Sequence, residues 1–213
     1  MGAFNKVTKE SLDNVQINAG MLLKSFNPTT PAVPSAADII CATTGGITAT
    51  CTPTFEDFGA DIDNCPENTK ELKKVTGWEC TLAFTAVEVT ADTIKLALGA
   101  AGTVGSEIQP QNELINADFT DVYFVSERVD DKIVAIHLKN GLGGGLSYKT
   151  QKNGKGQISV TLTGHISLED IDDVPMSFYI CDNVRNTSRM AQTTSVTGTA
   201  STTSVTTPSS TKS

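Results

Sequence analysis

The sequence lacks any long apolar run. No segment approaches the ~20 consecutive apolar residues that a membrane-spanning helix needs. The opening residues, MGAFNKVTKES, contain no apolar core of the kind that marks a secretory signal peptide. Both absences predict a protein that has no membrane among its partners.

Basic residues are also scarce. The chain has 16 Lys and Arg against 24 Asp and Glu, which leaves a formal net charge of −8. A protein that binds nucleic acid tightly usually presents clustered Lys and Arg, so this composition argues against that class. An acidic surface instead repels the phosphate backbone.

Paired cysteines are absent from the sequence. The five cysteines form no C-x-x-C pair, whereas a zinc site would require closer spacing. A disulfide scaffold would be shorter and richer in cysteine. The pattern favours isolated buried thiols in a reducing compartment, although a Cys51–Cys65 or a Cys41–Cys51 bridge stays open.

Catalytic motifs are missing as well. The sequence has neither a G-x-S-x-G nucleophile elbow nor an H-E-x-x-H zinc motif. Its two histidines, His137 in IVAIHLK and His165 in VTLTGHIS, are typical of polar positions in strands. Aromatic residues make up only 6% of the chain, which argues against a cleft that stacks sugars. We therefore predict no enzyme activity, no cofactor and no metal, and a structural role is the default.

One glycine-rich stretch, KNGLGGGLSYKT at residues 139–150, resembles a phosphate-binding loop only superficially. Such a loop needs its last glycine directly before the lysine, but three residues separate Gly145 from Lys149. It also needs a helix to follow, whereas TQKNGKGQISVTLTGH has the residues of a hairpin. The stretch is better interpreted as a bend or bulge between strands.

The residues that are abundant indicate a mainly β fold. Thr, Gly, Ala and Val are frequent, and GWECTLAFTAVEVT (77–90) alternates as a half-buried strand does. Its apolar face is predicted to hold Trp78, Cys80, Leu82 and Phe84. One short helix is predicted at 91–98, where Thr90 can cap the start and Gly99 can end it.

Turn residues divide the rest of the chain into hairpins. IICATTGGITATC (39–51) is interpreted as a hairpin around Gly45-Gly46, because two β-prone runs flank the glycines. FTDVYFVSE and KIVAIHLK flank a tight turn. LSYKT and QISVTLTGHIS flank QKNGKG, and MSFYICD forms a final strand.

Composition also suggests the domain boundaries. We assign residues 1–187 to one β domain, which carries a Pro-rich arm at 27–37 that cannot join the interior of a sheet. Residues 188–213 are mostly Ser and Thr and cannot bury enough apolar surface to offset their ordering entropy. This segment is predicted to be a flexible tail.

Charged residues gather in separate loops of opposite sign. Complementary ends could meet head to tail between copies, and such contacts generate rings or filaments. The basic hairpin contains Lys149, Lys152 and Lys155. The two acidic loops, 56–67 and 169–173, include Asp57, Asp61, Asp172 and Asp173.

The order of these features resembles the major tail proteins, or tail tube proteins, of long-tailed bacteriophages. GWECTLAFTAVEVTADTIKLALGA leads from a strand into a short helix. FTDVYFVSERVDDKIVAIHLKNGLGGGLSYKTQKNGKGQISVTLTGHIS then gives a hairpin, the glycine-rich stretch, a lysine-rich hairpin and a strand ending in TGH. The resemblance covers roughly residues 12–183 and excludes the Pro-rich arm and the Ser/Thr tail.

The resemblance implies a β-sandwich or barrel-like domain with one short flanking helix. In this family six copies close a ring, their strands form a continuous inner barrel, and the rings stack into a hollow tube. The strands facing the lumen would come from 39–51 and 77–89, or from the hairpin at 144–165. Other partners would be the tape measure, tail tip and tail terminator proteins, with genome DNA passing through unbound.

These expectations identify the chain as a structural protein of the virion tail, assembled in the host cytoplasm. The glycine-rich stretch is then predicted to be a flexible loop at a contact between subunits or rings, ordered only on assembly. The alternative is a monomeric β domain that binds a host-surface ligand, as a tail tip or decoration module would. The candidate contact residues in this stretch are Gly141, Gly143, Gly144 and Gly145.

Overall fold

The computed structural model describes residues 7–183 of the chain. The predicted Ser/Thr-rich tail at 188–213 lies outside these residues, as does the predicted domain boundary at 187. The helices are α1 (Lys9–Asp13) and α2 (Ala91–Leu98), with 3-10 turns at Lys70–Leu72 and Asn116–Asp118. The strands are β1 (Gln16–Leu23), β2 (Thr43–Asp57), β3 (Lys73–Ala86), β4 (Ala101–Val104), β5 (Glu107–Pro110), β6 (Thr120–Arg128), β7 (Lys132–Gly143), β8 (Ser147–Lys149), β9 (Gln157–Thr163) and β10 (Met176–Asp182).

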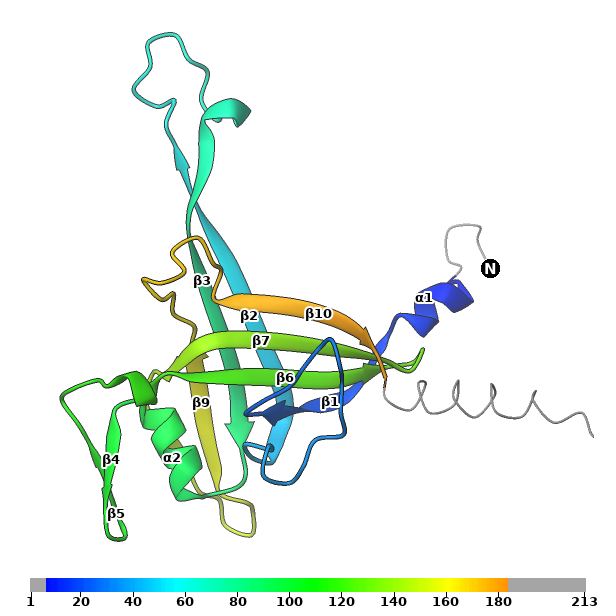
Figure 1. Ribbon diagram of the computed structural model, residues 1–213, viewed down its shortest axis with the longest axis vertical. Coiled ribbons are helices and arrows are strands. Elements are labelled where there is room, and N and C mark those ends of the chain that lie inside the picture. The colour runs from blue at the N-terminus through cyan, green and yellow to red at the C-terminus, as the bar shows by residue number, and fades with distance from the viewer. Residues whose placement is uncertain (1–6, 184–213) are drawn as a thin grey trace, which may run out of the picture.

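Eight of the strands form one antiparallel sheet that folds over on itself into two layers. Strands β1, β6, β7 and β10 make one layer and β2, β3, β9 and β8 make the other, and the two layers cross in Figure 1. The end of β7 joins them, because Leu142 and Gly143 pair with β9. The prediction of a mainly β, sandwich-like or barrel-like fold with a short flanking helix is confirmed.

The core lies between the two layers. Leu82 and Leu162 on one layer and Val122 and Leu138 on the other have no exposed surface. Burying each of these side chains stabilises the fold by roughly 1.5–3 kcal/mol. The core therefore holds the two layers in a fixed relation and positions the loops at both ends.

A segment that follows the Pro-rich arm closes the open side of the sandwich. Ile39 bridges to Leu23 of β1. The N–H of Ile40 donates to the carbonyl of Leu22 at 2.9 Å, and the N–H of Val87 donates to the carbonyl of Ala42 at 2.9 Å. These bonds connect the edge of β1 to the end of β3, so the two layers approach a closed barrel.

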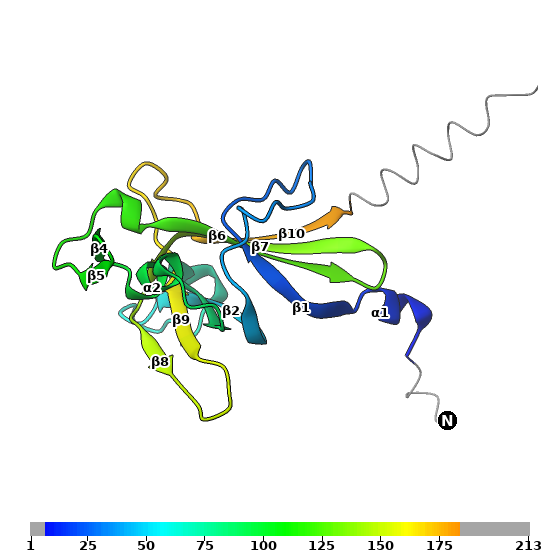
Figure 2. The ribbon, with the colours of Figure 1, turned by 90° about the horizontal axis from the view of Figure 1, so that it is seen from below.

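The Pro-rich arm lies on the outer face of the first layer. As predicted, residues 27–37 contain no strand. The ring of Phe26 contacts the ring of Tyr123 at 6.4 Å, and Tyr123 in turn stacks on His137 with ring centroids 4.0 Å apart. The arm thereby covers part of a face that the second layer leaves open, on the side opposite β8 and β9 (Figure 2).

Helix α2 begins and ends where the sequence predicts. The hydroxyl of Thr90 accepts a hydrogen bond from the N–H of Thr93, and Gly99 adopts a φ of +76° that favours glycine. Ala97 is fully buried against the core. The shorter helix α1, capped by Thr8, was not predicted.

The prediction of a hairpin at 39–51 is wrong. Residues 43–57 form the single long strand β2, and its partner is β3. Gly45 and Gly46 have φ values of +78° and +82°, and the pairing register shifts between Thr44 and Ile47. The two glycines form a bulge that bends the strand, because positive φ serves a bulge as well as a turn.

Strands β2 and β3 continue well beyond the body of the fold as a projecting hairpin, which runs to the top of Figure 1. The predicted apolar face of β3 is therefore buried over only part of its length. Cys80, Leu82 and Phe84 are buried as predicted, but Trp78 is 38% exposed because no second layer faces it. The connecting residues 58–72 form the tip.

The remaining hairpins are confirmed. Strands β6 and β7 pair around a turn in which Asp131 has a φ of +59°. Strands β8 and β9 pair around a connection that contains Asn153 at a φ of +59°. Strand β10 adds to the free side of β7, with Met176 opposite Leu138.

Candidate assembly surfaces

The glycine-rich stretch packs against helix α2 within one chain. Gly141 and Gly143 belong to strand β7. A Cβ atom on Gly143 would lie 2.1 Å from the carbonyl oxygen of Leu96 and 2.5 Å from that of Ala97. The absence of a side chain at Gly143 is what lets the helix backbone approach the strand this closely.

The next two glycines are also held by their own chain. The N–H of Gly144 donates to the carbonyl of Thr161, and the N–H of Gly145 donates to the carbonyl of Ala97, both at 3.0 Å. These bonds show that the stretch can be held within a single chain, and its ordering on assembly stays a prediction. A role for these glycines in contacts between copies stays a prediction.

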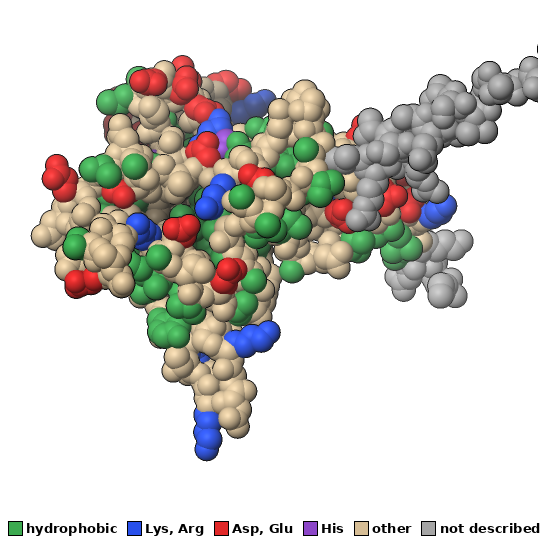
Figure 3. Space-filling model, turned by 60° about the horizontal axis from the view of Figure 1, so that its bottom comes forward, with side chains coloured by type: hydrophobic (Ala, Val, Ile, Leu, Met, Phe, Trp, Pro, Cys, Tyr) green, Lys and Arg blue, Asp and Glu red, His purple; other side chains and the backbone are tan. Residues whose placement is uncertain are grey.

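The predicted basic residues share one exposed hairpin. Lys149 ends β8, and Lys152 and Lys155 lie in the connection to β9, all three exposed. Residues 147–158 include no acid. Figure 3 shows this projection at the bottom of the view with basic side chains at its tip.

The first predicted acidic loop forms the tip of the projecting hairpin. Asp61 is exposed there, whereas the carboxylate of Asp57 accepts hydrogen bonds from the backbone of its own loop. Its Oδ1 accepts from the N–H of Gly59 at 2.9 Å and its Oδ2 accepts from the N–H of Asn68 at 3.0 Å. Residues 56–74 hold six acids and three lysines, so the tip is less negative than residues 56–67 alone.

The second predicted acidic loop precedes β10. Asp172 is exposed, but the carboxylate of Asp173 forms an ion pair with Lys139 of its own chain. The hydrogen bond from Lys139 holds the pKa of Asp173 below its usual value. Asp173 is thus less available to a neighbouring copy than the sequence indicated. Along the long axis, the first acidic loop lies at the end opposite the β8–β9 tip, whereas the loop before β10 lies near the middle (Figure 1).

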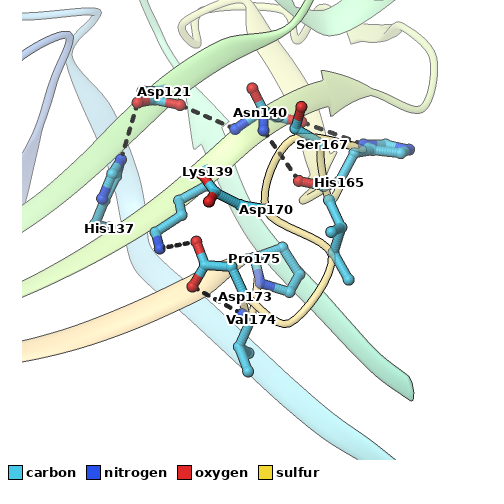
Figure 4. Close-up of a pocket in the computed structure, with 11 residues that line it drawn as sticks. Asp121, His137, Lys139, Asn140, His165, Ser167, Asp170, Asp173, Val174 and Pro175 are labelled. Atoms are coloured by element: carbon cyan, nitrogen blue, oxygen red, sulfur yellow. Dashed lines mark hydrogen bonds and ion pairs between the residues drawn. The ribbon is translucent and has the colours of Figure 1, made fainter. Parts of the chain in front are cut away.

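A polar cluster joins the ends of four strands, as Figure 4 shows. Oδ1 of Asp121 accepts from the N–H of Asn140 at 2.9 Å. The side-chain amide of Asn140 donates to the carbonyl of His165 at 3.2 Å, and the N–H of Lys139 donates to the carbonyl of Pro175 at 2.8 Å. These bonds fix the starts of β6 and β10 and the segment after β9 to β7.

The cavity within this cluster measures about 140 Å³. Pockets that bind drug-sized ligands are typically 300–1,000 Å³, so this one suits a few water molecules. The side chains of Lys139 and Asp173 that line it neutralise each other. The described residues contain no group of three or more metal-ligating side chains. We interpret the cluster as a structural clasp.

His137 is a buried member of the clasp. The side chain is 11% exposed, and its Nε2 lies 3.2 Å from Oδ2 of Asp121 without forming an aligned hydrogen bond to any described residue. Burial lowers the pKa of His137 below 6.5 and outweighs the opposite effect of Asp121. Lys139 also lowers the pKa and Asp173 raises it, both by smaller amounts.

The lowered pKa of His137 predicts a loss of stability in mild acid. Below pH 6.5 the unfolded chain binds a proton that the folded chain resists, so stability is complete above this pH and falls as the pH drops toward the folded-state pKa. His137→Gln should flatten this fall. Urea denaturation at pH 7 and pH 5 measures it. An identical decline in the parent and the variant would show that other groups cause it.

The sequence did not reveal an exposed apolar surface on the projecting hairpin. On the projecting hairpin, Phe55, Phe58, Val75 and Trp78 are 38–55% exposed, and Phe55 pairs directly with Val75. We call these four residues the hairpin apolar patch. The register of β2 and β3 places Phe55 opposite Val75, but the sequence could not predict that the body of the fold leaves this hairpin uncovered.

A second apolar surface follows the edge strand β10. Phe178 and Ile180 are 61% and 65% exposed on one face of the strand. Among residues 7–183, β10 pairs with β7 alone, and its other edge has backbone groups free to pair. An open edge with exposed apolar side chains is a template for another strand.

A groove of about 530 Å³ lies between helix α2, the start of β4 and the segment before β6. Its walls carry Asp92 and Lys95 of the helix together with Ile115 and Val122. Asp92 lies 3.7 Å from Lys24 across one end, as an exposed ion pair. Over residues 7–183, no helix is long and apolar enough to cross a membrane.

Comparisons with known proteins are sparse. No family model matches the sequence, and no curated protein matches it. Among solved structures, the fold is similar to a chain described as "Virion of native gene transfer agent (GTA) particle". The TM-score is 0.38 and the identity 11%, over 75% of this chain and 95% of the other.

Proposed function

We propose that this chain is a structural virion protein whose copies close into hexameric rings, and that the rings stack into the tail tube of a long-tailed phage. The observation that carries the proposal is the projecting β2–β3 hairpin. It extends beyond the core and exposes the hairpin apolar patch, whose four side chains are 38–55% accessible. Clustered exposed apolar side chains mark interaction sites.

The open edges of the sheet supply the contacts within a ring. Within the described part of the chain, β2 pairs only with β3 and β10 pairs only with β7. Closing six copies into a ring would pair these edges and remove the risk of uncontrolled association. The exposed Phe178 and Ile180 on β10 would be covered in the same step.

Charge at the two ends favours stacking in one direction. The β8–β9 tip carries Lys149, Lys152 and Lys155. The tip of the projecting hairpin, which contains Asp61, lies at the other end, and the loop that contains Asp172 lies between the two ends (Figure 1). In a stack of identical rings the basic end of one copy meets the acidic end of the next. Such a heterologous contact repeats without limit and builds a tube.

The charge arrangement predicts that two variants with reversed charges at opposite ends restore assembly when they are mixed. Lys152→Glu with Lys155→Glu should block tubes, and so should Asp61→Lys with Asp172→Lys. A mixture of the two variant proteins should form tubes of alternating composition, because each blocked end then meets a complementary one. Light scattering of each protein and of the mixture measures this. Failure of the mixture, with both variants folded, would contradict the charge pairing.

The remaining roles follow from a tube. A lumen formed by a chain of net charge −8 repels phosphates, so genome DNA passes through it without specific binding. The tape measure, tail tip and tail terminator proteins would contact the tube along its length and at its ends. The protein would act in the virion without catalysis.

The ring itself is tested by native mass spectrometry of the purified protein across a concentration series. The expected result is a species of six chains that grows as the concentration rises, with few intermediates. A monomer that binds host-surface material and never reaches six chains would support a ligand-binding module in place of a tube. Other fixed ring sizes would contradict the hexamer.

A further inference from the structure

Two of the five cysteines meet in the structure. Cys51 of β2 lies directly opposite Cys80 of β3, and their Sγ atoms are 2.7 Å apart as free thiols. Directly opposite residues of antiparallel strands have Cα atoms about 4.5–5.5 Å apart. A disulfide requires about 4.4–6.8 Å, so the backbone already has the spacing for a bond.

Neither disulfide that the sequence left open, Cys51–Cys65 or Cys41–Cys51, fits the fold. Six residues of extended strand separate Cys51 from the start of the loop that holds Cys65, which is roughly 20 Å. Cys41 lies before the start of the same strand β2, at its other end. Neither can reach Cys51, and the expectation of isolated thiols fails for this pair.

The pair occupies the neck of the projecting hairpin. On the core side of Cys80, Leu82 is fully buried, whereas on the outer side Trp78 is 38% exposed. Cys51 is partly exposed and Cys80 has no exposed surface. A soluble reagent therefore reaches Cys51 first, and Cys80 can react only with a group that is already bound to Cys51.

We propose that Cys51 and Cys80 form a redox pair that closes into a cross-strand disulfide by exchange with a low-molecular-weight disulfide such as oxidised glutathione. The thiolate of Cys51 attacks one sulfur of the reagent, the reagent's S–S bond breaks, and one glutathione thiolate leaves. Cys80 then loses its proton, which ends on a released glutathione thiolate, and attacks Sγ of Cys51. The second glutathione leaves, so two protein thiols are oxidised and one reagent disulfide is reduced.

The second step depends on pH. Burial, with a smaller effect of Cys51, raises the pKa of Cys80 to about 12. Only the thiolate attacks, so closure is slow near neutral pH. Its rate rises about tenfold for each unit by which the pH increases toward the pKa of Cys80. The closed bond prevents β2 and β3 from separating at the neck. This inference stands independently of assembly.

The test uses the full-length protein incubated with oxidised glutathione, quenched with acid, alkylated and mapped as peptides without reduction. The expected result is one internal bond between the Cys51 and Cys80 peptides, formed about tenfold faster at pH 8.5 than at pH 7.5. A stable mixed disulfide on Cys51, an unreacted pair in folded protein, or a bond to another cysteine would overturn the proposal.

Single variants test the order of attack. Cys80→Ser should accumulate glutathione on Cys51, because the second step is blocked. Cys51→Ser should leave Cys80 unmodified, because the buried thiol has no route to the reagent. Rapid modification of Cys80 in Cys51→Ser would overturn the assigned order. Serine is close to cysteine in size, and urea denaturation of each variant checks that it remains folded.

Discussion

Replacing Gly143 by alanine should lower the free energy of unfolding by about 3 kcal/mol, at the upper end of the usual cost of overpacking. The added Cβ would meet the backbone oxygens of Leu96 and Ala97 at 2.1 and 2.5 Å. Backbone atoms of a helix cannot rotate aside as a side chain can. Helix α2 would have to move away from β7, and Ala97 would lose its place in the core. Urea denaturation at neutral pH measures the change.

Gly144 provides the matched control one residue away. A Cβ there would have its nearest neighbour, the oxygen of Thr161, at 3.6 Å, which is ordinary contact. Gly144→Ala should change the free energy of unfolding by no more than about 0.5 kcal/mol. If Gly143→Ala unfolded at the same urea concentration as Gly144→Ala, the close packing of α2 on β7 would be contradicted.

Replacing Val75 by glutamate should abolish assembly and leave the monomer folded. Val75 is 48% exposed and pairs with Phe55 in the hairpin apolar patch. Burying a new charge at a contact costs several kcal/mol. Each 1.4 kcal/mol raises the concentration needed for assembly about tenfold. Sedimentation velocity over a concentration series measures the shift.

Val129→Glu is the control for this prediction. Val129 is 47% exposed, almost the same as Val75, but it lies in the turn between β6 and β7, away from the projecting hairpin. This variant should assemble as the parent does. Equal assembly of Val75→Glu and the parent, with both proteins folded, would show that the hairpin apolar patch is not a contact.

Local signals in the sequence were enough to predict several elements. Helix α2 has a side chain that caps its first turn at Thr90 and a glycine at its end, so both boundaries could be predicted. The β6–β7 and β8–β9 hairpins follow from β-prone runs separated by turn residues. These features depend on residues close together in the chain.

The errors came from features that depend on distant residues. Gly45-Gly46 allows either a turn or a bulge, and the choice depends on the partner strand β3. The close approach of α2 to Gly143 is a tertiary contact that no spacing of glycines encodes. The facing of Cys51 and Cys80 requires the register of two strands whose connecting tip is 15 residues long, from 58 to 72.

For the candidate surfaces too, some features could be predicted from the sequence and others depend on the fold. The exposure of Lys152 and Asp61 was predictable, because charged residues in loops usually stay solvated. The bond from Asn68 to Asp57 and the ion pair between Asp173 and Lys139 were not predictable, since each joins residues that only the fold brings together. The hairpin apolar patch could be found only once the layers were known.

Negative-stain electron microscopy of the purified protein would show whether copies of this chain build a hollow tube. Samples would be prepared at low and high concentration, with and without a tail-tip initiator complex. We expect six-fold rings or hollow tubes whose number rises with concentration or on adding the initiator. Dispersed monomers at every concentration, even with the initiator present, would contradict the proposed tube.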